Sequence, residues 1–180
     1  MKAFFVFDVE SVGLFGDAFA VAGGVYLANG AAQSEFRFAC DLRQCAGPYE
    51  DRKWVEANVP VLPVTCASPE VMRTAFWSAW DNAQARFPGI VMAAECAWPV
   101  EAGFLISCVK DDPFSRKFKG PYPLHEIASF MAAAGMDPMN TFERRPSELP
   151  VHDPLADARQ SARLLSEALA KIDPTGNREP

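Results

Sequence analysis

Near the start of the chain, an apolar run leads directly into two carboxylates. Residues 3–7 are apolar or aromatic, and Asp8 and Glu10 follow with one valine between them. This run predicts a strand over residues 2–10 that lies centrally in a sheet. Residues two apart on a strand point to the same face, so the two carboxylates lie side by side. They would repel each other and resist ionisation unless a cation sat between them, and oxygen ligands of this kind suit Mg²⁺ or Mn²⁺. The pair alone is also compatible with an acidic strand end that enters solvent.

The rest of the chain alternates between strand and helix patterns. Residues 28–30, Ala-Asn-Gly, form a hairpin turn between two further expected strands. The expected strands are 19–27, 31–39 and 90–95, and the expected helices are 69–86, 99–109, 123–134 and 154–172. Phe76 and Trp80 fall on the apolar stripe of one helix and are predicted to lie in the core, whereas His125 and Glu126 are predicted on a helix as surface or packing residues. This order predicts an α/β fold with a mixed β-sheet.

The length of 180 residues predicts one domain, which we place at 1–172, with a polar tail at 173–180. Residues 40–67 show little periodicity and contain Gly47, Pro48, Pro60 and Pro63. We expect this segment to be an insertion or elaborated loop at the domain edge, with short helical pieces around Trp54. The segments 110–122 and 136–151 are expected to be loops.

The charge balance narrows the class of function. Seventeen Lys and Arg against 23 Asp and Glu give a net charge of −6, so nonspecific binding of nucleic acid through bulk charge is excluded. A compact acidic site remains allowed, because two divalent cations would add four positive charges.

No stretch of about 18 apolar residues exists to span a bilayer, and the N-terminal run is predicted to be a strand rather than a signal peptide. Five cysteines without a C-x-x-C pair indicate reduced thiols in a cytoplasmic protein rather than a zinc site.

A second chemical pattern lies near the other end of the chain. Asp153 and Pro154 form a helix start, with a capping acid and proline at the first helical position. Asp157 then falls in the first turn, where the helix dipole favours an anion. His152 lies just outside the helix, free to swing over whatever Asp157 binds. A surface histidine beside a capping acid would give the same local pattern.

The two segments together resemble the first and last motifs of the DEDDh 3′–5′ exonucleases, the family of proofreading exonuclease subunits, ribonuclease T and oligoribonuclease. That family opens with D-x-E-T-T-G-L on its first strand, which DVESVGL at 8–14 matches with Ser11 in place of a threonine. Its last motif, H-x-x-x-x-D at the start of the final helix, is matched by His152 and Asp157. The resemblance covers nearly the whole chain apart from 40–67, and it implies a ribonuclease H-like mixed β-sheet flanked by α-helices.

The middle motif departs from the family pattern. The family shows H-N-x-x-F-D-x-x-F-L after a strand, whereas this chain has CAWPVEAGFL at 96–105. Aligning the terminal Phe-Leu places Glu101 on the aspartate, in the first turn of its helix, and leaves Cys96 and Ala97 where the histidine and asparagine would stand. Glu95, at the end of the preceding strand, is the alternative for this third carboxylate.

The resemblance implies hydrolysis of phosphodiesters with two divalent ions, Mg²⁺ or Mn²⁺. Asp8 would bridge both ions, and Glu10 and Asp157 would complete the coordination of the first ion. Glu101 or Glu95 would help to hold the second ion. His152 would act as the general base, and the products would be nucleoside 5′-monophosphates.

The resemblance also implies which residues contact the substrate. The segment after Glu10 is where family members touch the terminal base, and this assigns substrate binding to Ser11, Gly13, Leu14 and Phe15. The acidic chain indicates short or single-stranded DNA or RNA as the partner. We also expect no membrane partner, and a monomer or homodimer. The alternative function is a catalytically weakened ribonuclease H-like nucleic-acid-binding or scaffold module, which the altered middle motif favours.

Overall fold

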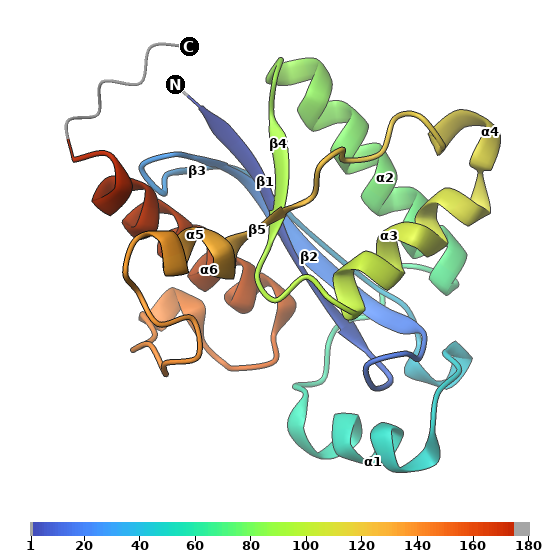
Figure 1. Cartoon of the computed structure of the whole chain (residues 1–180). Helices are drawn as coiled ribbons and strands as arrows, with labels where there is room; N and C mark the ends of the chain where they lie inside the picture. The colour runs from blue at the N-terminus through green and yellow to red at the C-terminus, as the bar shows by residue number, and fades with distance from the viewer. Residues whose placement is uncertain (1, 175–180) are drawn as a thin grey trace.

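The computed structural model describes residues 2–174, and a five-stranded mixed sheet lies at its centre (Figure 1). The strand order is β3-β2-β1-β4-β5. The strands are β1 (Ala3–Ser11), β2 (Ala18–Leu27), β3 (Ala32–Ala39), β4 (Val91–Ala94) and β5 (His125–Glu126). The first three form an antiparallel meander, and β4 and β5 run parallel to β1. The strand that carries Asp8 and Glu10 is therefore central, as predicted.

Helices cover both faces of the sheet (Figure 1). The α-helices are α1 (Tyr49–Asn58), α2 (Pro69–Arg86), α3 (Val100–Asp111), α4 (Pro113–Arg116), α5 (Ile127–Ala133) and α6 (Pro154–Ile172), and short 3-10 turns span Leu42–Gln44 and Pro146–Glu148. Phe5, Phe7 and Val9 pack with α2 and α3 in one core, which also contains Phe76 and Trp80 as predicted. Phe4 and Val6 pack with α5 and α6 in a second core. Because side chains alternate along β1, Asp8 and Glu10 continue the row that faces α6.

The short length of β4 opens one edge of β1 beside the two carboxylates. The register pairs β1 with β4 from Phe4 to Val6, and β1 continues for five more residues. The chain that leaves β4 turns into α3 next to this unpaired stretch (Figure 1). This arrangement brings the start of α3 to the part of β1 that carries Asp8 and Glu10.

The structure corrects the prediction of a helix over 123–134. His125 and Glu126 form β5, which pairs with Ala93 and Ala94 of β4. The Glu126 carboxylate accepts a hydrogen bond from the Ser129 N–H and so caps α5 at its later start. Pairing with β4 outweighs the local helical pattern of these two residues.

The segments expected to be loops carry short helices. Segment 40–67 contains α1 around Trp54, as predicted, while α4 lies within 110–122 and a 3-10 turn within 136–151. Hydrogen bonds tie segment 40–67 to the β1–β2 turn: Asp17 N–H donates to the Ala46 carbonyl at 2.7 Å, and Ala46 N–H donates to the Asp17 carboxylate at 2.8 Å.

Most of the expected polar tail, 175–180, lies outside the described residues. Within 2–174, no helix has the length and apolarity needed to cross a membrane.

Candidate active site

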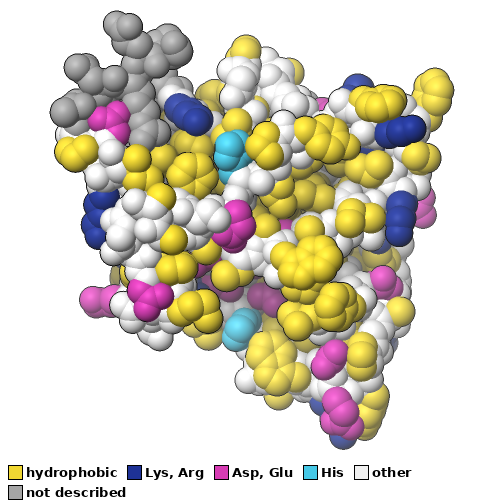
Figure 2. Space-filling view, viewed as in Figure 1, with side chains coloured by type: hydrophobic (Ala, Val, Ile, Leu, Met, Phe, Trp, Pro, Cys, Tyr) yellow, Lys and Arg dark blue, Asp and Glu magenta, His cyan; other side chains and the backbone are white. Residues whose placement is uncertain are grey.

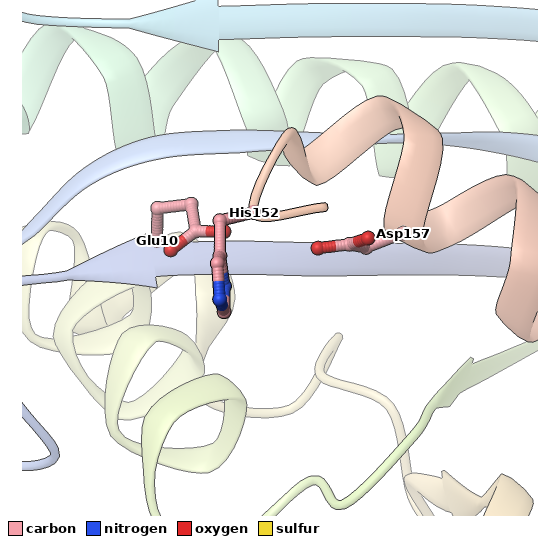
Figure 3. Close-up of side chains that lie close together, drawn as sticks. All are labelled: Glu10, His152 and Asp157. Atoms are coloured by element: carbon pink, nitrogen blue, oxygen red, sulfur yellow. The ribbon is translucent and has the colours of Figure 1, made fainter. Parts of the chain in front are cut away.

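Two elements from opposite ends of the chain bring Glu10, His152 and Asp157 together (Figure 3). Glu10 lies on β1, Asp157 lies in the first turn of α6, and His152 lies in the connection just before that helix. One ligand atom from each side chain lies within 4.8 Å of the others, and Asp8 is not a member of this group of described residues. A carboxylate, an imidazole and a second carboxylate at this spacing could hold a divalent cation.

The cap of α6 determines where His152 and Asp157 lie. The Asp153 carboxylate accepts hydrogen bonds from the N–H groups of Leu155 and Ala156 at 3.0 and 3.1 Å, as the sequence predicted for a capping acid. Arg37 on β3 also donates to this carboxylate, at 2.7 Å. His152 adopts a positive φ of 58° immediately before the cap. The cap therefore turns the chain sharply and directs the histidine toward β1.

Burial and the negative charges of four other carboxylates raise the pKa of Asp8. Burial raises its pKa well above the usual value, and the charges of Glu101, Asp157, Glu10 and Glu95 raise it further, in that order. Glu10 is 9% exposed, and burial, Asp157 and Glu101 raise its pKa to about 8. All the carboxylates selected from the sequence thus contribute to one region of negative potential. Such a region favours cations and resists full ionisation without them.

Glu101 reaches this region from α3. Its side chain is buried in the first turn of the helix, and burial raises its pKa to about 7, while hydrogen bonds to the backbone of Glu101 itself and of Val9 oppose the rise. The Val9 contact is possible because β4 ends before this part of β1. Among the neighbouring charges on Asp8, that of Glu101 has the largest effect.

Glu95 lies on the other side of the same region and has a partner on α6. Its carboxylate accepts a hydrogen bond from the Ser161 hydroxyl at 2.8 Å, which partly opposes the rise in its pKa caused by burial. Glu95 affects the pKa of Asp8, but it is not among the causes of the raised pKa of Glu10, whereas Glu101 affects both. The electrostatics therefore couple Glu101 more closely than Glu95 to the two carboxylates of β1.

Arg144 is a participant that the sequence reasoning missed. Its guanidinium donates a hydrogen bond to the Asp157 carboxylate and another, at 2.9 Å, to the Glu148 carbonyl. The pKa of Asp157 is still raised, because burial outweighs the opposing effects of Arg144 and His152. Arg144 belongs to the aperiodic segment 136–151, and no local pattern pointed from it to Asp157.

Trp54 is a second residue that the sequence reasoning did not connect with the site. It lies on α1, and its ring meets the His152 ring edge-to-face, with centroids 5.1 Å apart and planes at 80°. Segment 40–67 thus reaches the site histidine. An aromatic residue on a short helix was visible in the sequence, but its contact with a residue about 100 positions away was not.

A cavity of about 730 Å³ adjoins these residues between the β1–β2 turn and α1. The space-filling view shows acidic atoms in a depression at the middle of this face, with a histidine at its lower edge and apolar side chains beside it (Figure 2). The cavity is lined by Glu10 and Trp54, and also by all four residues assigned to substrate contact, Ser11, Gly13, Leu14 and Phe15. Leu14 and Phe15 are 61% and 84% exposed, which leaves their side chains accessible to a ligand.

Gly13 shows why the turn beside this cavity needs a glycine. Its φ is +75°, and a Cβ at this position would lie 2.0 Å from an Asp51 carboxylate oxygen. The Ser11 hydroxyl donates to the Gly13 carbonyl at 2.7 Å, so it holds the turn together. The turn therefore fixes where Leu14 and Phe15 emerge.

Comparison with known proteins supports the fold. No protein-family model and no curated protein sequence matches this chain. Among solved structures, the chain is similar to S. pombe Pop2p in its Mg²⁺- and Mn²⁺-bound form, with a TM-score of 0.59, 12% sequence identity, and coverage of 86% of this chain and 68% of that chain. The likeness confirms the predicted fold class, a ribonuclease H-like mixed sheet flanked by helices.

Proposed function

We propose that this protein is a metal-dependent 3′–5′ exonuclease that removes nucleoside 5′-monophosphates from single-stranded or short DNA or RNA. The observation that carries the proposal is that four other carboxylates act electrostatically on Asp8, and that two of them, Glu10 and Asp157, form a group with His152. The motifs at 8–14 and 152–157 that resemble the DEDDh family supply these residues. We assign residues 1–172 to a single exonuclease domain.

The donor set fits divalent metal ions. Carboxylate oxygens are the ligands that Mg²⁺ and Mn²⁺ prefer. Burial, and then the charges of neighbouring carboxylates, raise the pKa values of Asp8, Glu10 and Glu101, and a bound cation would favour their ionised forms. The similar Pop2p structure contains Mg²⁺ and Mn²⁺. We assign two ions to this site: Asp8, Glu10 and Asp157 would supply carboxylate oxygens to hold them, and Glu101 would help to hold the second ion.

Each remaining residue has a role in this reaction. An imidazole nitrogen of His152 accepts the proton of the attacking water, and Trp54 packs against the same ring. When bound, the cations would acidify the water and stabilise negative charge on the phosphate and the leaving 3′ oxygen. The turn formed by Ser11 and Gly13 presents Leu14 and Phe15 to the terminal nucleotide. The five free cysteines fit a cytoplasmic location.

A second candidate function is nucleic-acid binding with little or no hydrolysis, as a scaffold module. Two observations favour it. Cys96 and Ala97 stand where the DEDDh family has a histidine and an asparagine. The Arg144 guanidinium donates a hydrogen bond to the Asp157 carboxylate, which we assign to a metal ion. Both candidates use the same fold and the same acidic region.

Incubation with 5′-labelled single-stranded DNA and RNA oligomers, in Mn²⁺, Mg²⁺ or chelator, distinguishes the candidates. The exonuclease shortens the labelled strand stepwise from its 3′ end in the presence of metal and releases 5′-monophosphates, which chromatography identifies. Asp8→Asn serves as the matched inactive control. Binding without any metal-dependent shortening would support the scaffold module instead, and internal cleavage would contradict an exonuclease.

A further inference from the structure

A cluster of exposed aromatic and basic side chains lies where α3 passes into α4, away from the acidic region. We call this the aromatic–basic tract; it consists of Lys110, Phe114, Lys117, Phe118, Lys119 and Tyr122. Phe114, Phe118 and Tyr122 are 99%, 85% and 74% exposed. Single exposed apolar residues are ordinary, but three large rings within nine residues mark an interaction surface.

The backbone under the tract is held in place, so the rings are displayed from a defined framework. The Asp112 carboxylate caps α4 by accepting from the Ser115 N–H at 3.1 Å. Arg116 is buried and donates to the Cys108 carbonyl at 2.8 Å, which ties α4 to α3. The Tyr122 hydroxyl donates to the Lys117 carbonyl at 2.9 Å and closes the following turn.

The tract is positively charged within an acidic protein. The whole chain carries −6, but the two acids beside the tract are engaged locally. Asp111 accepts two hydrogen bonds from Arg73, at 2.5 and 2.9 Å, and Asp112 caps α4. Lys110, Lys117 and Lys119 are all exposed. Figure 2 shows basic and apolar surfaces interleaved at the edge where Figure 1 places α3 and α4.

A groove runs along α3 from the turn beside the larger cavity to Lys110, the one tract residue that lines it. A cavity of about 240 Å³ follows α3 from Leu14 and Phe15, which also line the larger cavity, to Lys110. Gly103 faces this groove, and a Cβ there would meet no atom within 4 Å. The nine helical steps from Glu101 to Lys110 span about 14 Å at a rise of about 1.5 Å per residue. A chain leaving the site along α3 would therefore arrive at Lys110, where the tract begins.

We propose that the aromatic–basic tract binds the single-stranded part of a nucleic acid whose 3′ end occupies the active site. Exposed rings that stack on bases, interleaved with lysines that contact phosphates, are the chemistry by which proteins hold single strands without sequence preference. The inference rests on the proposed function, and it assigns to α3 and α4 the selection of single-stranded substrates several nucleotides long. The groove favours this ligand over a second copy of the chain, because it leads from the site to Lys110 at the start of the tract.

Fluorescence anisotropy with a labelled 12-nucleotide single strand tests the tract, measured in chelator over a range of salt concentrations. Each lysine–phosphate contact contributes to the salt dependence. We expect Lys117→Glu with Lys119→Glu to weaken binding at least about tenfold. The slope of log K against log salt should fall by about 1.4, because each phosphate contact on a single strand contributes about 0.7. Phe114→Ala with Phe118→Ala should weaken binding about tenfold while leaving the salt dependence nearly unchanged.

The matched control is Lys2→Glu with Lys171→Glu, which makes the same change in net charge at two exposed lysines elsewhere. An equal loss of affinity in this control would overturn the inference, because bulk charge would then explain the effect. Tighter binding of a duplex than of the single strand would also overturn it. A change in oligomeric mass on Phe114→Ala with Phe118→Ala, with strand binding intact, would make the tract an interface between copies.

Hydrolysis measurements separate this inference from the proposed function. In Mn²⁺, the loss of kcat/KM caused by the lysine variant should be at least about ten times greater for the 12-nucleotide strand than for a dinucleotide. Equal losses of kcat/KM for the two substrates would contradict the proposal that the tract binds the single strand. Tract-dependent binding without hydrolysis of either substrate would leave the tract supported and refute the exonuclease.

Discussion

The guanidinium of Arg144 donates a hydrogen bond to the carboxylate of Asp157, inside the acidic region formed by β1, α3 and α6. Both side chains are largely buried, with 22% and 16% of their surfaces exposed. An arginine from an aperiodic segment thus supplies positive charge at a carboxylate that we assign to a metal ion. A cation at this carboxylate would share it with the Arg144 guanidinium, and the two positive charges would repel each other, which links the position of Arg144 to metal binding.

We expect Arg144→Ala to destabilise the metal-free protein by about 1–3 kcal/mol, because a buried carboxylate loses its partner. The stabilisation by Mn²⁺ should increase in this variant, since the ion no longer competes with a guanidinium. Thermal melts in chelator and in Mn²⁺ measure both effects. The control is Arg43→Ala, which removes the exposed pair with Asp41 and should change little. A smaller metal effect in Arg144→Ala would show that Arg144 supports metal binding.

Asp8→Asn should abolish the stabilisation by divalent metal. Asp8 is the carboxylate on which the charges of the others act, so an ion bound in this region must contact or closely approach it. Melting curves with and without Mn²⁺ should differ for the unchanged protein and coincide for the variant. An undiminished metal shift in Asp8→Asn would place the ion elsewhere.

The metal-free protein should lose stability as the pH rises from about 4.5 to about 8. The folded-state pKa values of Glu10, about 8, and Glu101, about 7, lie above the ordinary value of 4.5. The folded state therefore binds more protons than the unfolded state in this window, and unfolding becomes easier as protons are released. Glu10→Gln should raise the melting temperature in chelator at pH 8 by at least about 2 °C, corresponding to ~1 kcal/mol, and should have little effect at pH 4. Identical shifts at both pH values would contradict the raised pKa.

His152→Ala should reduce the rate of hydrolysis about 10²–10⁴-fold, which is the usual effect of losing a general base. The carboxylates that we assign to the metals are unchanged in this variant, so its melting shift with Mn²⁺ should largely persist. Activity assays from pH 6 to 9, together with melts, measure both properties. Near-normal hydrolysis across this range would remove His152 from the proton transfer, and loss of the metal shift would make it a ligand.

Glu101→Gln should reduce hydrolysis at least about tenfold, equivalent to roughly 1.4 kcal/mol of transition-state stabilisation. The isosteric amide preserves the shape of the side chain and removes its charge. Glu95→Gln should reduce hydrolysis less, because Glu95 is already engaged by Ser161. Glu101→Asp restores the carboxylate found in the resembling family and should retain activity. An inactive Glu95→Gln beside an active Glu101→Gln would reverse the assignment.

Local sequence patterns determined the central strand and the cap of the last helix. Alternation along β1 placed Asp8 and Glu10 on one face, and the capping acid with proline placed Asp157 in the first turn of α6. Both inferences depend on backbone periods that operate over a few residues, and they needed no knowledge of distant contacts. These two segments also supplied the resemblance that predicted the ribonuclease H-like fold.

The tertiary structure alone decided which residues from the irregular segments reach the site. Trp54 meets His152, and Arg144 meets Asp157, across sequence separations that no periodic pattern encodes. His125 and Glu126, predicted on a helix, form a strand in the structure because they pair with the edge of β4. Local preferences in such segments are weak, so packing and burial determine where their side chains lie.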